Sequence, residues 1–294
     1  MPMPAEAPLN ERIVREIERS EIAFATDRMT AIKERPGNPE GVEIARIGGA
    51  VCLYSRTMPW PSFNTVKGLR DEDAARLDEI AAFYRERDRN VQFEIVPGLI
   101  GPDLLKALAG RGLYPSGFHA SLYGRPGTGS DAAAGDSEAR SRDGSGTGAM
   151  DSAGDPLRIV ELGQDDFETY ATIHCRAFGL PDNGIPHVAA NNRVLHARPG
   201  WTFYLAYWEG APAAAAVMHE AEGTASFTFA ATLPEFRGRG IHRRLLLHRL
   251  AAAAERGCTL AVGQCAFLSA SHRNMERAGM RLGYVRTTWT KREP

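Results

Sequence analysis

The sequence predicts an α+β protein of two domains, each a mixed, mostly antiparallel twisted sheet flanked by helices. The chain of 294 residues is longer than one core usually needs. Near its middle, residues 126–155 contain seven glycines, six acids, two arginines and no aromatic residue, so they cannot form a core. The segments on either side share one order of strands and helices, which indicates a diverged duplication. We therefore expect domains over 1–125 and 157–294, joined by a flexible linker over 126–156.

The N-terminal segment opens with a helix over about residues 11–32, where apolar side chains recur at helical spacing. A second helix over 71–87 begins with three acidic residues, as the helix dipole favours, and a short third helix begins at Pro102. Apolar runs bounded by turn residues predict five strands, over residues 42–47, 50–56, 63–69, 91–96 and 118–125.

The C-terminal segment repeats this order with an additional strand and two helices at its start. A strand over 157–162 precedes helices over about 165–178 and 185–195. A long helix begins at about residue 240 and ends before Gly257, a typical C-terminal cap. The other predicted elements are strands over 202–210, 213–220, 225–233, 259–268 and 284–292, and a helix over 269–279.

Composition excludes several classes of protein. The net charge of −1 gives no general attraction for nucleic acid or anionic membranes. No apolar run reaches the ~18–20 residues of a membrane span, and the first residues are too polar for a signal peptide, so we expect a cytoplasmic protein. The four cysteines form no CxxC pair and have no partnering histidine cluster, which predicts free thiols and no metal site.

Residues 236–242, FRGRGIH, join a predicted strand to the long helix. Gly238 and Gly240 can adopt positive φ, so that successive amides converge on an anion at the helix N-terminus. Arg237 and Arg239 can add charge-assisted contacts, and a diphosphate is the natural ligand. A dinucleotide fingerprint does not fit, because Arg243 stands where it needs a third glycine; nor does a Walker loop, which needs Gly-Lys-Ser/Thr.

The stretch TLPEFRGRGIHRRLL resembles the coenzyme A signature [RQ]-x-x-G-x-[GA] of the GNAT superfamily of acyl-CoA-dependent N-acyltransferases. The match extends to the preceding V-x-P-x-[YF]-R pattern, here Thr232-x-Pro234-x-Phe236-Arg237, and the later SASHRNMERAGMRLGY resembles the family's second conserved segment. The resemblance covers about residues 157–292. It implies a GNAT fold and an acetyl-CoA-dependent N-acetyltransferase, in which an amine attacks the thioester directly in a ternary complex.

The resemblance also implies the cofactor contacts. Ala231, Thr232 and Leu233 would pair with the pantetheine arm like an added strand, and a backbone N–H near Ala231 would face the thioester oxygen. Asn274 is a candidate for a side contact. The pyrophosphate would be held by the backbone amides of Arg237, Gly238, Arg239, Gly240, Ile241 and His242.

Two positions depart from the family pattern. His242 stands where glycine or alanine is usual, and the helix dipole favours a neutral imidazole there. Met275 stands where many members carry a tyrosine that protonates the leaving thiolate, and the nearest tyrosine, Tyr284, lies in the last predicted strand. The absent tyrosine, together with the lack of an identified base, favours the alternative function, a catalytically weak acyl-CoA-binding regulatory or sensor protein.

An amine acceptor must lose a proton before attack. Candidates for the base are His219, Glu220 and Glu222. Because side chains alternate along a strand, His219 should point inward like Val217, whereas Glu222 fits a solvated hairpin tip. A water relay from backbone carbonyls is an equal alternative to a side-chain base. Residues 179–200 would wall the acceptor site and show no concentrated charge, so the acceptor is a small-molecule or protein amine of open identity.

The N-terminal segment has acidic residues where a phosphate would bind, so we expect it to bind no coenzyme A and to pack against the active segment or wall the acceptor site. The arginines of 237–249 are explained by phosphate and a solvated helix face, which predicts no nucleic-acid partner. The sequence leaves open whether the chain forms a homodimer.

Overall fold

A computed structural model describes residues 8–127 and 155–291, and these divide into two compact units. The C-terminal unit comprises the described residues of 124–261 together with 273–280. The N-terminal unit comprises the described residues of 3–123 together with 262–272 and 281–294. Most of the predicted linker, 126–156, lies outside the described residues.

The sheet of the N-terminal unit has the strand order β1-β2-β3-β4-β11-β5, with β10 beside β5. From β1 to β5 in this order, neighbouring strands are antiparallel except for β3 and β4, which run parallel. The strands are β1 (Val42–Ile47), β2 (Ala50–Ser55), β3 (Thr65–Lys67), β4 (Gln92–Ile95), β5 (Leu113–Gly124), β10 (Leu260–Ala266) and β11 (Arg281–Lys291).

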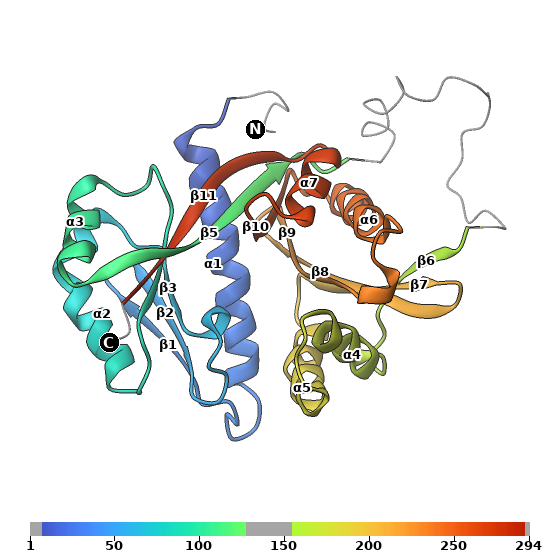
Figure 1. Ribbon diagram of the computed structural model, residues 1–294, viewed down its shortest axis with the longest axis horizontal. Helices are drawn as coiled ribbons and strands as arrows, with labels where there is room; N and C mark the ends of the chain where they lie inside the picture. Colours follow the sequence, from blue (N-terminus) through green and yellow to red (C-terminus); the bar gives the residue numbers. More distant parts are fainter. Residues whose placement is uncertain (1–7, 128–154, 292–294) are drawn as a thin grey trace. The chain divides into compact units, whose positions relative to one another are not determined.

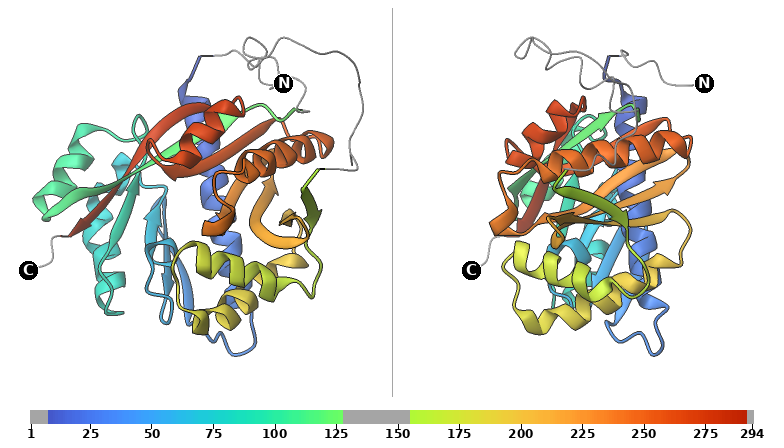
Figure 2. Two further views of the ribbon diagram at one scale, coloured as in Figure 1. Left: turned by 45° about the vertical axis from the view of Figure 1, so that its right-hand side comes forward. Right: turned by 90° about the vertical axis from the view of Figure 1, so that its right-hand side faces the viewer.

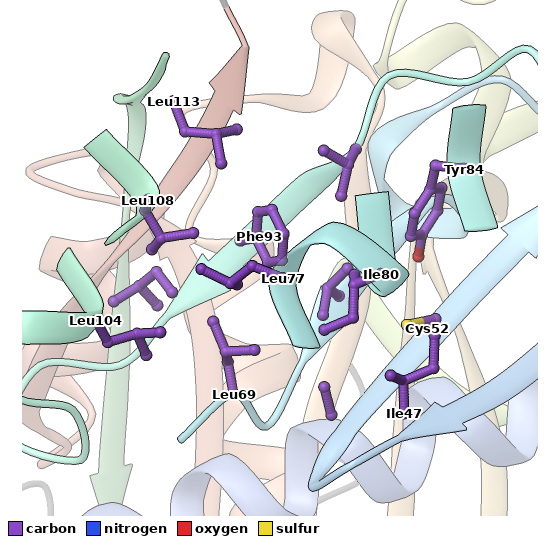
Figure 3. Close-up of a cluster of buried hydrophobic side chains, with 14 residues drawn as sticks. Ile47, Cys52, Leu69, Leu77, Ile80, Tyr84, Phe93, Leu104, Leu108 and Leu113 are labelled. Atoms are coloured by element: carbon purple, nitrogen blue, oxygen red, sulfur yellow. The ribbon is translucent and has the colours of Figure 1, made fainter. Parts of the chain in front are cut away.

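Helices cover both faces of this sheet, and the pleat explains why. Along β3 and β4, Val66 and Phe93 point into an apolar cluster, whereas the neighbouring Lys67 and Glu94 point to the face covered by α1 (Glu11–Lys33). The apolar cluster includes side chains from α2 (Leu77–Arg85) and α3 (Pro102–Gly110) and forms the core of the unit (Figure 3).

The last strand of the chain, β11, lies between β4 and β5 and pairs with both. Its Trp289 packs against the apolar cluster, and on the other face Arg286 forms ion pairs with Glu21 and Glu94. We expected this strand together with residues 157–280, but its contacts place it in the sheet of the N-terminal segment. Figure 1 shows β11, in dark red, running beside the green β5.

The C-terminal unit contains the antiparallel strands β6 to β9 in sequential order. Helices α4 and α5 lie on one face of these strands and α6 on the other (Figure 1, Figure 2). The bounds are β6 (Leu157–Glu161), α4 (Phe167–Ala177), α5 (Ile185–His196), β7 (Trp201–Trp208), β8 (Ala211–Ala221), β9 (Thr224–Thr232), α6 (Ile241–Glu255) and α7 (Ala270–Arg277). The predicted fold class, mixed and mostly antiparallel sheet flanked by helices, is confirmed.

Candidate functional site

The turn between β9 and α6 has the backbone conformation that its glycines predict. Gly238 has φ +79° and Gly240 has φ +76°, and Gly240 caps the N-terminus of α6. A Cβ atom built at either glycine would meet nothing within 4 Å, so both face open space. Glycine is therefore required here for its left-handed conformation, and the backbone is left accessible to a ligand.

The amides of this turn are available for an anion. The first hydrogen bond of α6 is donated by the Arg244 amide to the Gly240 carbonyl, at 3.1 Å. Among the described residues, the amides of Gly238, Arg239, Gly240 and Ile241 have no hydrogen-bond partner. Consecutive free N–H groups at the positive end of a helix dipole suit a phosphate group.

The two arginines of the turn have different surroundings. Arg237 donates from Nε to the Thr232 carbonyl at 3.2 Å and from Nη2 to the Ala177 carbonyl at 2.9 Å. It thereby ties the end of β9 to the end of α4. The guanidinium of Arg239 lies 5.2 Å from the centre of the Trp208 ring and is exposed at the mouth of the turn.

The ring of His242 is directed at α7. Asn274 Nδ2 lies 3.2 Å from His242 Nδ1, and an amide nitrogen can only donate, so the imidazole accepts. Burial, assisted by the charge of Arg249, lowers the pKa of His242 to about 4. The histidine is thus neutral at physiological pH, as predicted, and the causes are burial and the charge of Arg249. Two of the predicted cofactor residues, His242 and Asn274, are in contact with each other.

Ala231, Thr232 and Leu233 form the end of β9 and its exit. Ala231 pairs with Ala215, and the Leu233 amide donates to the Ala213 carbonyl at 3.0 Å. Just before them the register shifts, because Phe229 and Ala230 together oppose the single residue Ala216. This is a β-bulge, and Phe229 has the left-handed φ of +49°. No local pattern in the sequence predicts this bulge, since Phe and Ala are ordinary strand residues.

The predicted base candidates lie elsewhere on β8. His219 is four residues along the strand from Ala215, a separation of about 13 Å, and is buried with its ring 4.6 Å from that of Trp201. Glu220 forms an ion pair with Arg256, which follows the far end of α6. The structure therefore does not bring this pair together with the turn. Glu222 lies in the β8–β9 turn, as expected of a hairpin tip.

No tyrosine replaces the missing acid at the predicted position. Met275 of α7 is 4 % exposed and carries no proton to donate. Tyr284 lies in β11, within the N-terminal unit, where burial raises the pKa of its hydroxyl.

Arg249 was expected on a solvated face of α6, and that expectation is wrong. Its side chain is 1 % exposed and packs against the sheet. The missed signal is its place in the apolar stripe of the helix, with Leu245 and Leu246 one turn earlier and Ala253 one turn later.

In the N-terminal unit an acidic side chain fills the corresponding turn. Asp73 accepts hydrogen bonds from the amides of Gly49 at 2.8 Å and Arg70 at 2.9 Å and is 1 % exposed. The predicted helix over 71–87 begins as a 3₁₀ turn, Asp71–Arg76, before α2, and the Asp73 carboxylate caps that turn. The carboxylate therefore satisfies one amide of this turn, that of Arg70, and one amide of the β1–β2 turn, that of Gly49.

Across residues 8–127 and 155–291, no three His, Cys, Asp or Glu side chains are arranged to hold a metal ion. None of the helices in these ranges combines the length and apolarity needed to cross a membrane. None of the four cysteines forms a disulfide, and three of them are buried.

Comparison with known proteins finds a family match within the C-terminal segment. Residues 167–280 match the model of the acetyltransferase (GNAT) family. This range contains the turn, the end of β9 and Asn274. No curated protein matches the chain.

Solved structures resemble the chain over nearly its whole length. A GCN5-related N-acetyltransferase from Kribbella flavida has a TM-score of 0.63 at 14 % identity and covers 93 % of this chain and 96 % of its own. A tandem GNAT protein from the clavulanic acid biosynthesis pathway has a TM-score of 0.60 at 15 % identity, with 99 % and 97 % covered. A GCN5-related N-acetyltransferase from Sphaerobacter thermophilus has a TM-score of 0.57 at 15 % identity, with 99 % and 93 % covered. At these identities the likeness shows the fold, which is that of tandem GNAT proteins.

Proposed function

Because residues 167–280 carry a GNAT acetyltransferase domain, we propose that this protein is an acetyl-CoA-dependent N-acetyltransferase acting on a primary amine. The observation that carries the proposal is the turn at 237–242. Two left-handed glycines expose four amides at the start of α6. Consecutive backbone donors with an exposed arginine, Arg239, beside them suit a diphosphate.

The same turn supports the proposed placement of the cofactor. The residues that would hold the diphosphate are Gly238, Arg239, Gly240 and Ile241, through their free amides, with Asn274 as a side contact. The Arg237 amide, predicted to join them, already donates to the Pro234 carbonyl at 3.2 Å. The end of β9, Ala231 to Leu233, would pair with the amides of the pantetheine arm. Bound there, acetyl-CoA supplies an activated acyl group, and the chain's residues position it.

The proposed acetyl transfer needs only the amine and acetyl-CoA as reactants. The amine nitrogen forms a bond to the acetyl carbon, the carbon–sulfur bond breaks, and the proton lost by the amine ends on the thiolate. A backbone N–H near Ala231 would donate to the thioester oxygen as negative charge develops on it. One such donor contributes about 2.7–4 kcal/mol to the transition state.

Deprotonation of the amine has two candidate routes. His219 or Glu220 would serve as the base, or water held by backbone carbonyls would relay the proton. The four- to five-residue separation of His219 and Glu220 from the Ala215–Ala231 pair, together with the ion pair of Glu220, favours the relay. Proximity of the bound reactants alone lowers the barrier by about 7–11 kcal/mol, so a tuned base is not essential.

A binding protein without turnover is the second candidate. It is favoured by Met275, which stands buried where the family usually has its acid. A sensor would bind acetyl-CoA through the same turn and release no thiol in the presence of any amine.

The experiment that separates the two is a thiol-release assay with acetyl-CoA and a panel of primary amines, run beside calorimetric titration with acetyl-CoA. Binding together with amine-dependent thiol release and an acetylated product supports the transferase. Binding without release on any amine supports the sensor. Failure to bind acetyl-CoA contradicts both.

A further inference from the structure

A buried arginine lies behind the strands that form the proposed acetyl site. Arg249, in the middle of α6, is 1 % exposed because it occupies the sheet-facing stripe of the helix, where apolar residues are usual. No carboxylate lies within ion-pair distance of it in the part of the chain that the structure describes. A guanidinium buried without an anion is rare, because desolvation of the charge is unfavourable.

The contacts of Arg249 are made with main chain and an aromatic ring. Nη1 donates to the Val217 carbonyl at 3.0 Å, and Nε donates to the Leu245 carbonyl of its own helix at 3.2 Å. The guanidinium carbon lies 4.7 Å from the centre of the Phe227 ring. Val217 is on β8 and Phe227 on β9, so one side chain contacts both strands of the hairpin.

These contacts border the β-bulge. Pairing of β8 with β9 runs from Ala221 to Val217, which faces Thr228, and resumes at Ala215, which faces Ala231. Val217 is therefore the last paired residue of β8 before the bulge. On β9, Phe227 lies two residues before Phe229, where the bulge begins. A non-glycine residue with φ of +49°, as at Phe229, is strained and persists only where its surroundings hold it.

Packing alone does not explain an arginine at this position. Methionine or leucine would fill the space under the sheet without a buried charge, and such replacements of buried ions are often neutral or stabilising. Burial lowers the pKa of Arg249 only to about 10, so the side chain remains a cation and a five-proton donor at neutral pH. Unlike methionine, arginine supplies a rigid hydrogen-bond donor, which here bonds the Val217 carbonyl at the edge of the bulge.

We propose that Arg249 is a positioning residue that holds the β9 bulge at Phe229–Ala230, and so aims the backbone N–H beside Ala231 at the thioester oxygen. The bulge turns the strand just before the residues that would hold the cofactor arm. The catalytic part of this inference depends on the proposed acetyl transfer, whereas the structural part does not.

The test compares Arg249→Met with Arg249→Lys and with the wild type in the full-length chain. The control is Leu250→Met, a volume-conserving change at the neighbouring buried position of the same helix. Crystal structures of the variants report the φ angle of Phe229 and the β8–β9 register. Thermal unfolding reports whether each variant is folded.

In Arg249→Met we expect a folded protein in which Phe229 leaves the left-handed region. Amine acetylation should show kcat lowered about 10- to 100-fold with KM for acetyl-CoA within twofold, because the phosphate turn is untouched and only an oxyanion donor is misplaced. Arg249→Lys should recover part of the rate, and Leu250→Met should retain wild-type kcat and the bulge.

Two results would overturn the proposal. One is a folded Arg249→Met variant that keeps the bulge as in the wild type; the other is a shifted bulge with unchanged kcat. If the wild type acetylates no amine, the proposed function fails, and the conformation of residues 228–231 in the variants still decides whether Arg249 holds the bulge. If Arg249→Met does not fold, the same measurements on Arg249→Lys decide.

Discussion

His242 shows how one unusual residue adapts to a site built from backbone. The usual small residue at this position leaves the helix start open, whereas His242 turns its ring toward Asn274 and away from the turn. Because burial lowers the pKa of the ring to about 4, no positive charge is added beside the amides at neutral pH. The departure from the family pattern is thus compatible with the proposed diphosphate site.

The depressed pKa of His242 predicts a pH-dependent contribution to stability. Between pH 6.5 and 4 the unfolded chain binds a proton that the folded protein excludes, so stability falls as the pH falls through this window. The difference of about 2.5 units corresponds to about 3 kcal/mol. His242→Asn should remove this part of the pH dependence, measured by urea unfolding from pH 4 to 7.

The matched control for this measurement is His187→Asn, at an exposed position of α5. It should leave the difference between pH 4 and pH 6.5 as in the wild type. An unchanged pH dependence in His242→Asn would show that His242 is not excluded from protonation in the folded protein.

Much of the candidate site could be predicted at the scale of residues. Glycines alternating with arginines before a helix specify a turn and its free amides through local rules, and the structure has that turn. Arg249 and the bulge could not be predicted in this way. A cation in a helix is usually solvated, and whether it is buried depends on the strands packed against it.

At the scale of elements, Arg237 connects the strand that leads to the turn with the helix on the opposite face from α6. It bonds the last carbonyls of β9 and α4, so the two elements end at a common point. The sequence assigned Arg237 to the phosphate alone, because a contact sixty residues away in the chain has no local signal.

Removing this connection should loosen the end of α4. In Arg237→Gln we expect the amides of Phe178, Gly179 and Leu180 to exchange hydrogen about 5- to 10-fold faster, equivalent to about 1 kcal/mol, the usual contribution of such a bond. Hydrogen exchange followed by mass spectrometry measures it.

Arg239→Gln provides the comparison, because the guanidinium of Arg239 lies over Trp208 and bonds neither carbonyl. Its exchange rates in α4 should equal those of the wild type. Equal rates in both variants would mean that Arg237 does not restrain the helix end.

At the scale of the whole molecule, the last strand belongs to the sheet built by the first part of the chain. Alternation predicted a strand at 284–292, but the same alternation suits either sheet, so its neighbours could not be read from sequence. Its partners are set by tertiary contacts: Trp289 in the apolar cluster, and Arg286 between Glu21 and Glu94. Burial raises the pKa of Glu94, but the charges of Arg286 and Lys67 lower it by more, so that the net shift is downward. The buried carboxylate therefore needs these two cations to remain ionised.

Ending the chain after Met280 should therefore unfold the sheet of the N-terminal unit. The truncation removes the strand between β4 and β5 and leaves Glu94 buried without Arg286, and loss of one partner of a buried pair costs about 3–5 kcal/mol. Loss of amide protection over residues 42–95 in hydrogen exchange would report it.

A chain that ends after Lys291 keeps β11 and should retain protection over residues 42–95. Full protection after truncation at Met280 would contradict the assigned pairing of β11.

We propose a single acetyl-CoA site per chain, at the turn that contains Gly240, because the Asp73 carboxylate already accepts from the Arg70 amide at the corresponding position of the N-terminal unit. Calorimetric titration of the full-length protein with acetyl-CoA tests this directly. We predict saturation at one equivalent, no detectable binding in Gly240→Asp, and wild-type affinity in Gly257→Asp, which has the same left-handed φ at the other end of α6. Two equivalents, no binding by the wild type, or unchanged affinity in Gly240→Asp would contradict it.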